Sequence, residues 1–177
     1  MRVDEATGAI AFRRLAHDDL AELFLWLCRP HVVRGYAPAP SSYAEVMARY
    51  GPRAGEGNAV LAHVVLIDGA RVGYAQHYAI AAFPAYAAAM AAGPRAAAVD
   101  LFIGDEALTG AGLGARAIRR YVEDAVFAAG AFDACIAAPA EGNARAIRAF
   151  EKAGFRRWKS IAPEDGPPEC ALRLDRA

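Results

Sequence analysis

A glycine-rich segment between an apolar run and a long amphipathic stretch constrains this chain most strongly. It reads Thr109-Gly110-Ala111-Gly112-Leu113-Gly114-Ala115, after apolar residues at 97–103 and before helical periodicity at 112–128. This order predicts a strand, a tight loop and a helix. Glycines let backbone N–H groups come close to a ligand, and the unpaired donors of a helix N-terminus favour a pyrophosphate. A plain strand-to-helix turn would also use glycine, so the loop alone leaves both interpretations open.

Two familiar phosphate-binding loops are excluded by their spacing. A P-loop ends in Gly-Lys-Ser or Gly-Lys-Thr, whereas Gly114 is followed by Ala115 and Arg116. A Rossmann fingerprint lies in the first strand–helix unit with the spacing G-x-G-x-x-G. This loop lies beyond residue 100 and has no third glycine at that offset, so it belongs to neither class.

The rest of the chain alternates further strands and helices. Asp68-Gly69 marks a tight turn between two strands, and the alanines at 81–96, broken by prolines and a glycine, form a long excursion that we expect to cover a binding site. We expect helices at 18–27, ended by Pro30, at 43–50, capped by Ser41 or Ser42, at 112–128 and at 143–153, and strands at 10–15, 60–67, 71–80, 97–103, 134–138, 155–161 and 170–174. They predict one α/β (α+β) domain over residues 1–177, with a mixed, mostly antiparallel twisted sheet of about six or seven strands and helices on both faces.

The composition excludes several classes of protein. The chain has 177 residues with 20 Lys+Arg against 20 Asp+Glu, so no net charge draws it to nucleic acid or to a membrane surface. Three widely spaced cysteines and four scattered histidines predict neither a disulfide framework nor a metal site. The chain starts without an apolar run and contains no stretch of about twenty apolar residues. We therefore expect a cytoplasmic protein, either a monomer or a homodimer.

A second motif lies one predicted strand beyond the glycine-rich loop and reads N-A-R-A-I-R-A-F-E-K-A-G-F from Asn143 to Phe155. With this motif and the loop, the chain resembles the Gcn5-related N-acetyltransferases. The resemblance implies that acetyl-CoA binds with its pyrophosphate on the loop amides and its pantetheine arm against Asn143, in a splay between the fourth and fifth strands. The cofactor-binding residues that it implies are Ile103, Thr109, Gly110, Ala111, Gly112, Leu113, Gly114, Ala115, Asn143, Phe150 and Lys152.

Shorter pieces of the chain are similar to the bacterial aminoglycoside 6'-N-acetyltransferase branch of that family. These pieces are Trp26-Leu27, His31-Val32, Gly73-Tyr74-Ala75-Gln76, Val99-Asp100, Arg145-Ala146-Ile147-Arg148 and Asp165-Gly166-Pro167. The similarity implies a small-molecule primary amine as acceptor, in a pocket lined by the hairpin, the 81–96 excursion and the first helix. Its expected ligands are Trp26, Gln76, Tyr78, Asp100 and Asp165, although helical spacing explains Trp26 equally well as a core residue.

Asp100 interrupts an otherwise apolar strand. A buried carboxylate without a partner is costly and its pKa rises, so strand alternation could simply turn it toward solvent. The alternative is a carboxylate that receives an ammonium substrate and accepts its proton before the amine attacks a thioester. The resemblance places the family's functional aspartate at Asp100, so we expect it to be the catalytic residue.

Three positions depart from the family pattern. Phe150 stands where many members have a tyrosine, the candidate general acid, and Tyr78 is a possible substitute. Ala138 stands where the aminoglycoside enzymes often have an aspartate, and Thr109 replaces a glutamine or arginine. Other acceptors therefore stay open: a siderophore precursor, a polyamine or a protein N-terminus. Phe150 also leaves open a non-catalytic CoA-binding module.

Overall fold

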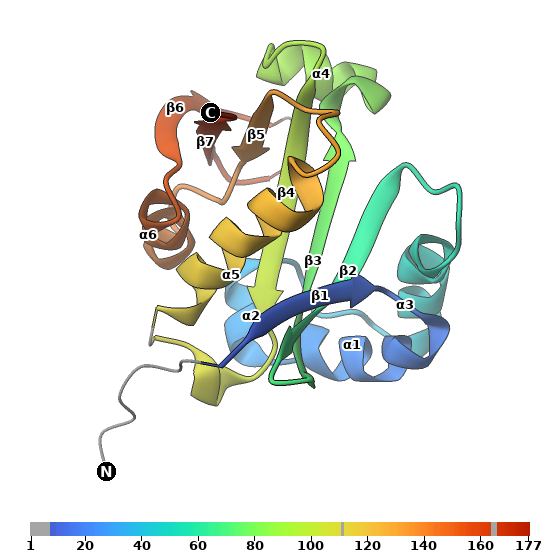
Figure 1. Cartoon of the computed structure of the whole chain (residues 1–177). Coiled ribbons are helices and arrows are strands. Elements are labelled where there is room, and N and C mark those ends of the chain that lie inside the picture. The colour runs from blue at the N-terminus through green and yellow to red at the C-terminus, as the bar shows by residue number, and fades with distance from the viewer. Residues whose placement is uncertain (1–7, 111, 164–165) are drawn as a thin grey trace.

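The computed structural model describes residues 8–110, 112–163 and 166–177, which form one seven-stranded sheet (Figure 1). The strands lie in the order β1-β2-β3-β4-β5-β7-β6. Neighbouring strands are antiparallel except for the parallel pair β4–β5. The strand bounds are β1 Ile10–Arg14, β2 Val60–Ile67, β3 Ala70–Ala79, β4 Ala96–Ile103, β5 Ala134–Ala137, β6 Arg156–Ile161 and β7 Glu169–Asp175. The expected fold class is confirmed.

Helices cover both faces of this sheet. One face carries α5 (Leu113–Tyr121) and α6 (Ala144–Lys152), whose apolar sides share a core with residues of the central strands. The other face carries α1 (Leu20–Leu27), α2 (Pro30–Gly35) and α3 (Tyr43–Tyr50), as Figure 1 shows. A third cluster joins α4 (Pro84–Met90) to one end of the sheet. No described helix is long and apolar enough to cross a membrane.

Local sequence signals explain several element boundaries. Asp68 and Gly69 both have positive φ values, 48° and 82°, as the tight turn of a hairpin requires. The Ser42 hydroxyl accepts a hydrogen bond from Glu45 N at 3.3 Å and caps α3, which decides between the two serines that the sequence offered. Asn143 caps α6 in the same way, with its Oδ1 3.1 Å from Ala146 N.

Three expectations need correction. Pro30 does not end the helical region but begins α2, because a proline in the first turn gives up an N–H that has no intrahelical partner. The expected helix at 112–128 is α-helical only to Tyr121 and continues as a π-helical turn over Val122–Val126. The 81–96 excursion, which we expected to cover a binding site, contains α4. It packs Met90 against the sheet and so covers part of the hydrophobic core.

The splay expected between the fourth and fifth strands is present. Three residues of β4 pair with β5, ending at Ala98 and Ile136, and the rest of β4 has no partner in β5. The part of β4 that lacks a partner in β5 runs from Val99 to Ile103, and its other edge stays paired with β3. The two strands diverge beside the N-terminal ends of α5 and α6, and this opening positions the site.

Candidate active site

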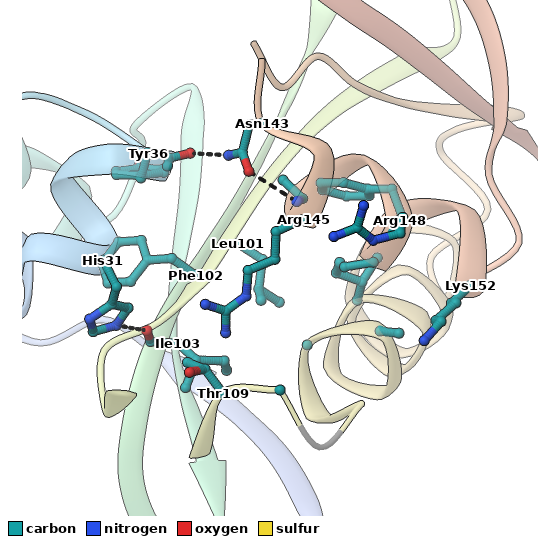
Figure 2. Close-up of a pocket in the computed structure, with 18 of the residues that line it drawn as sticks. His31, Tyr36, Leu101, Phe102, Ile103, Thr109, Asn143, Arg145, Arg148 and Lys152 are labelled. Atoms are coloured by element: carbon teal, nitrogen blue, oxygen red, sulfur yellow. Dashed lines mark hydrogen bonds between the residues drawn. The ribbon is translucent and has the colours of Figure 1, made fainter. Parts of the chain in front are cut away.

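A cavity of about 430 Å³ lies at the splay, between the glycine-rich loop, α6 and α2 (Figure 2). The end of β4 forms its floor through Leu101, Phe102 and Ile103. Most cofactor residues that the sequence predicted meet here: Ile103, Thr109, Gly110, Gly112, Gly114, Ala115, Asn143, Phe150 and Lys152. Ala111 lies outside the described residues.

The loop presents its backbone to this cavity. Gly110 and Gly112 have φ values of 98° and 78°, a region that residues with a Cβ rarely occupy. The Thr109 hydroxyl donates to the Glu106 carbonyl at 2.6 Å, so this side chain holds the turn that precedes the loop. Leu113 is 2% exposed and packs in the core without lining the cavity, which leaves only its backbone for a ligand.

One face of α6 adds positive charge. Arg145, Arg148 and Lys152 all line the cavity, and Figure 2 shows Arg145 reaching across it toward Thr109. Within the described part of the chain neither arginine makes an ion pair. The two arginines were not among the ligands expected from the sequence, although their spacing with Lys152 places all three on one helix face. Cations beside a glycine-rich helix N-terminus suit a ligand with several phosphates.

The short helix α2 closes the cavity from the opposite side. His31 Nε2 lies 2.9 Å from the Ile103 carbonyl, and the His31 side chain is only 7% exposed. Asn143 Nδ2 donates to the Gly35 carbonyl at 2.9 Å, so this amide joins α6 to α2. This wall was not expected from the sequence, because Pro30 was interpreted as the end of a helix and not as the start of α2.

A second cavity of about 560 Å³ adjoins the first. Both cavities are lined by Gly35, Tyr36, Leu101, Asn143, Ala146 and Phe150. Its lining also includes two acids, Asp100 and Glu169, and one cationic residue, Arg34. A ligand in the phosphate-binding cavity can therefore present its far end to a second molecule at this shared wall.

Asp100 rests on a buried hydrogen-bond network. Gln76 Nε2 donates to Asp100 Oδ2 at 2.7 Å, and Gln76 Oε1 accepts from the Tyr74 hydroxyl at 2.7 Å and from Arg53 Nη1 at 2.5 Å. Burial raises the pKa of Asp100, and the Gln76 bond with the charges of Arg53 and Arg49 offsets only part of that rise. A carboxylate with a raised pKa is a better proton acceptor than an ordinary one.

The other expected acceptor residues lie elsewhere. Trp26 is 7% exposed in the core against Gly104, where a Cβ would meet its ring at 2.2 Å. Tyr78 packs on Phe83 and Tyr86 at one end of the sheet, and burial raises its pKa. Neither lines a cavity at the splay, and Gln76 approaches the site only through Asp100. The second cavity is lined by α2, the loop after β5 and the start of β7, and the hairpin, the excursion and α1, from which we expected the walls of the acceptor pocket, contribute no residue to it. Asp165 lies outside the described residues.

One cavity thus suits a phosphate-bearing donor, and the adjoining cavity has room for a second substrate. This arrangement is typical of an enzyme that transfers a group between two molecules. The chain belongs to the acetyltransferase (GNAT) domain family, whose model matches residues 16–162. It is therefore an N-acetyltransferase, as the sequence predicted.

Several named members of this family are similar to the chain in sequence or in structure. One relative is aminoglycoside N(6')-acetyltransferase type 1 from Klebsiella pneumoniae, which is 29% identical over 176 residues. The match covers 93% of this chain and 83% of that protein. The protein of the same name from Serratia marcescens matches to the same extent. The crystal structure of aminoglycoside acetyltransferase AAC(6')-Ib in complex with coenzyme A has a TM-score of 0.81 at 28% identity, over 95% of both chains. Its complex with coenzyme A and kanamycin gives 0.80 at 29% identity, again over 95% of both chains.

Proposed function

We propose that this enzyme transfers the acetyl group of acetyl-CoA to a primary amine of an amino sugar of the aminoglycoside type. The observation that carries this proposal is the position of Asp100, in a cavity that shares a wall with the phosphate-binding cavity. The relatives named for aminoglycoside acetylation support the choice of acceptor.

The donor fits the first cavity by its chemistry. The amides around Gly110, Gly112 and Gly114 take the pyrophosphate, and the cations of α6 balance the remaining phosphate charge. The pantetheine arm follows the edge of β4 that lacks a partner in β5 beyond Ala98 and faces the splay. The thioester then lies at the shared wall, near Leu101 and Phe150.

The reaction needs a base but no protein nucleophile. The acceptor arrives as an ammonium, Asp100 takes its proton directly or through water, and the neutral nitrogen attacks the thioester carbonyl. The C–S bond then breaks, the CoA thiolate leaves, and the nitrogen gives up its second proton to water to become the neutral amide. Phe150 has no proton to give, so the thiolate is protonated by solvent. Cys135, which is fully buried, takes no part.

The test is the substitution Asp100→Asn. We expect kcat to fall by about 100-fold or more, the usual contribution of a general base, while the Kd for acetyl-CoA changes less than about twofold. Asp18→Asn, at an exposed carboxylate away from both cavities, is the matched control. Equal turnover in Asp100→Asn removes Asp100 from the mechanism.

The acceptor is identified by thiol release from acetyl-CoA across a panel of amines. Release with aminoglycosides, together with higher drug tolerance in a bacterial host that expresses the chain, supports the proposed acceptor. Tight CoA binding without release for any amine would instead indicate a binding module, the role that Phe150 left open.

A further inference from the structure

Glu169 is a second acid among the residues that line the cavity with Asp100, and no sequence motif marked it. It is the first residue of β7, and its backbone is fixed against the loop that follows β5. Cys170 N donates to the Pro139 carbonyl and Glu141 N donates to the Pro168 carbonyl, both at 2.8 Å. Glu169 thus faces the loop that starts at Ala138, which lines the same cavity.

The Glu169 carboxylate has no partner within the described residues. It makes no ion pair or hydrogen bond there, although the side chain is half-buried. Burial raises the pKa of Glu169, and the charge of Asp100 raises it further. Arg34 lines the cavity from an exposed position on α2 but forms no ion pair with either acid.

An acceptor with one ammonium group would neutralise only one of these two acids. A half-buried carboxylate without a counter-ion is unfavourable, and a second ammonium in the cavity would relieve both its desolvation and its repulsion with Asp100. The cavity volume of about 560 Å³ leaves room for such a molecule.

We infer that Glu169 binds a second ammonium group of the acceptor and so selects acceptors with two or more positive charges. This inference rests on the proposed function. It also accounts for Ala138, where the related enzymes often have an aspartate: this chain supplies the second acid to the same cavity from β7.

The test compares two acceptors that differ in one charge, 6-amino-6-deoxyglucose and 2,6-diamino-2,6-dideoxyglucose. Glu169→Gln keeps the shape of the side chain and removes its charge. We expect KM for the diamine to rise about tenfold, which corresponds to about 1.4 kcal/mol, while kcat for the diamine and KM for the monoamine stay within about twofold. Glu141→Gln, at an exposed neighbouring acid outside the cavity, should leave both KM values unchanged.

A second variant guards against a purely structural effect. Adding Ala138→Asp to Glu169→Gln returns one negative charge to the cavity from the neighbouring segment that follows β5, and we expect it to lower KM for the diamine again. Equal changes in KM for both acceptors would overturn the inference.

If the wild-type enzyme acetylates neither sugar, the proposed function fails on its own account. Isothermal titration calorimetry of the diamine into the CoA-loaded protein then decides whether Glu169 binds the second ammonium group. A Kd about tenfold weaker in Glu169→Gln supports the second ammonium site, and equal or absent binding by both proteins refutes it.

Discussion

Gln76 controls the proton affinity of Asp100, and its substitution tests the proposed base through the pH dependence of the reaction. The Gln76 side chain is 7% exposed, and its Nε2 donates to Asp100 Oδ2 at 2.7 Å. This bond stabilises the ionised carboxylate, which burial destabilises. Gln76→Met removes the donor and keeps an unbranched side chain of similar length. The Tyr74 hydroxyl still has Arg53 Nη1 at 3.3 Å.

The size of the effect follows from the loss of one charge-assisted hydrogen bond. Such a bond contributes about 1.5–3 kcal/mol, and one pKa unit corresponds to about 1.4 kcal/mol. Losing it disfavours the ionised form, so the pKa of Asp100 should rise by about one to two units. The acid limb of kcat/KM should move to higher pH by the same amount, because Asp100 must be ionised to accept a proton.

The assay is the decrease in thioester absorbance, measured from pH 5 to 9 at limiting acceptor. Ionisation of the acceptor amine is common to both enzymes and cancels from the comparison. Gln76→Glu is the second variant: it keeps an acceptor for Tyr74 and Arg53 but sets a carboxylate against Asp100, so its acid limb should move further than that of Gln76→Met. An acid limb that stays in place, or moves to lower pH, in a folded Gln76→Met enzyme that binds acetyl-CoA normally would refute the assignment of Asp100 as the base.

Two further predictions concern stability. Burial by itself raises the pKa of Asp19, but hydrogen bonds from Arg13 at 2.6 and 2.7 Å, from Ala16 N and from Arg71 outweigh it and lower the pKa to about 2. The ionised form thus stabilises the fold above about pH 4 and loses this effect as pH falls toward 2, so Asp19→Asn should lower the free energy of unfolding in urea by about 2–3 kcal/mol at pH 7; a deficit that persists unchanged to pH 2 would contradict this. His77 is 3% exposed, and its Nδ1 lies 2.9 Å from the Tyr121 hydroxyl. Burial lowers the pKa of His77 to about 4. The neutral imidazole therefore contributes fully to the free energy of unfolding above about pH 6.5, and this contribution is lost as pH falls to 4. The decline in unfolding free energy between pH 7 and 4 should be smaller by about 2–3 kcal/mol in His77→Gln, and an equal decline in both proteins would count against this reasoning.

Sequence alone predicted most of the fold, because local chemistry decides those features. The Asp68-Gly69 turn, the caps of α3 and α6 and the alternating strands each follow from a few neighbouring residues. The glycine-rich loop is likewise decided by local chemistry, since glycine readily adopts the positive φ values found at Gly110 and Gly112. The expected cofactor residues therefore lie largely where the sequence placed them.

The errors arose where long-range packing decides. Pro30 is compatible with both a helix end and a helix start, and only the contacts of α2 with Ile103 and Asn143 decide between them. Trp26 and Tyr78 have the size and character of pocket residues, yet the core takes up one and the α4 segment covers the other. Periodicity cannot distinguish a buried aromatic residue from one that lines a cavity.

The same distinction explains why the donor side of this enzyme was more predictable than the acceptor side. A pyrophosphate is bound mainly by backbone groups and one helix face, which lie within a single strand–loop–helix segment. We expect an amine acceptor to be bound by side-chain charge, and the two acids of the proposed acceptor cavity come from separate parts of the chain: Asp100 on β4 and Glu169 on β7. The effect of Asp100 on the pKa of Glu169 arises only when β5 brings the two strands into one sheet. We therefore expect that exchanging the acids, as in Glu169→Gln combined with Ala138→Asp, changes the choice of acceptor and leaves acetyl-CoA binding at the loop unchanged.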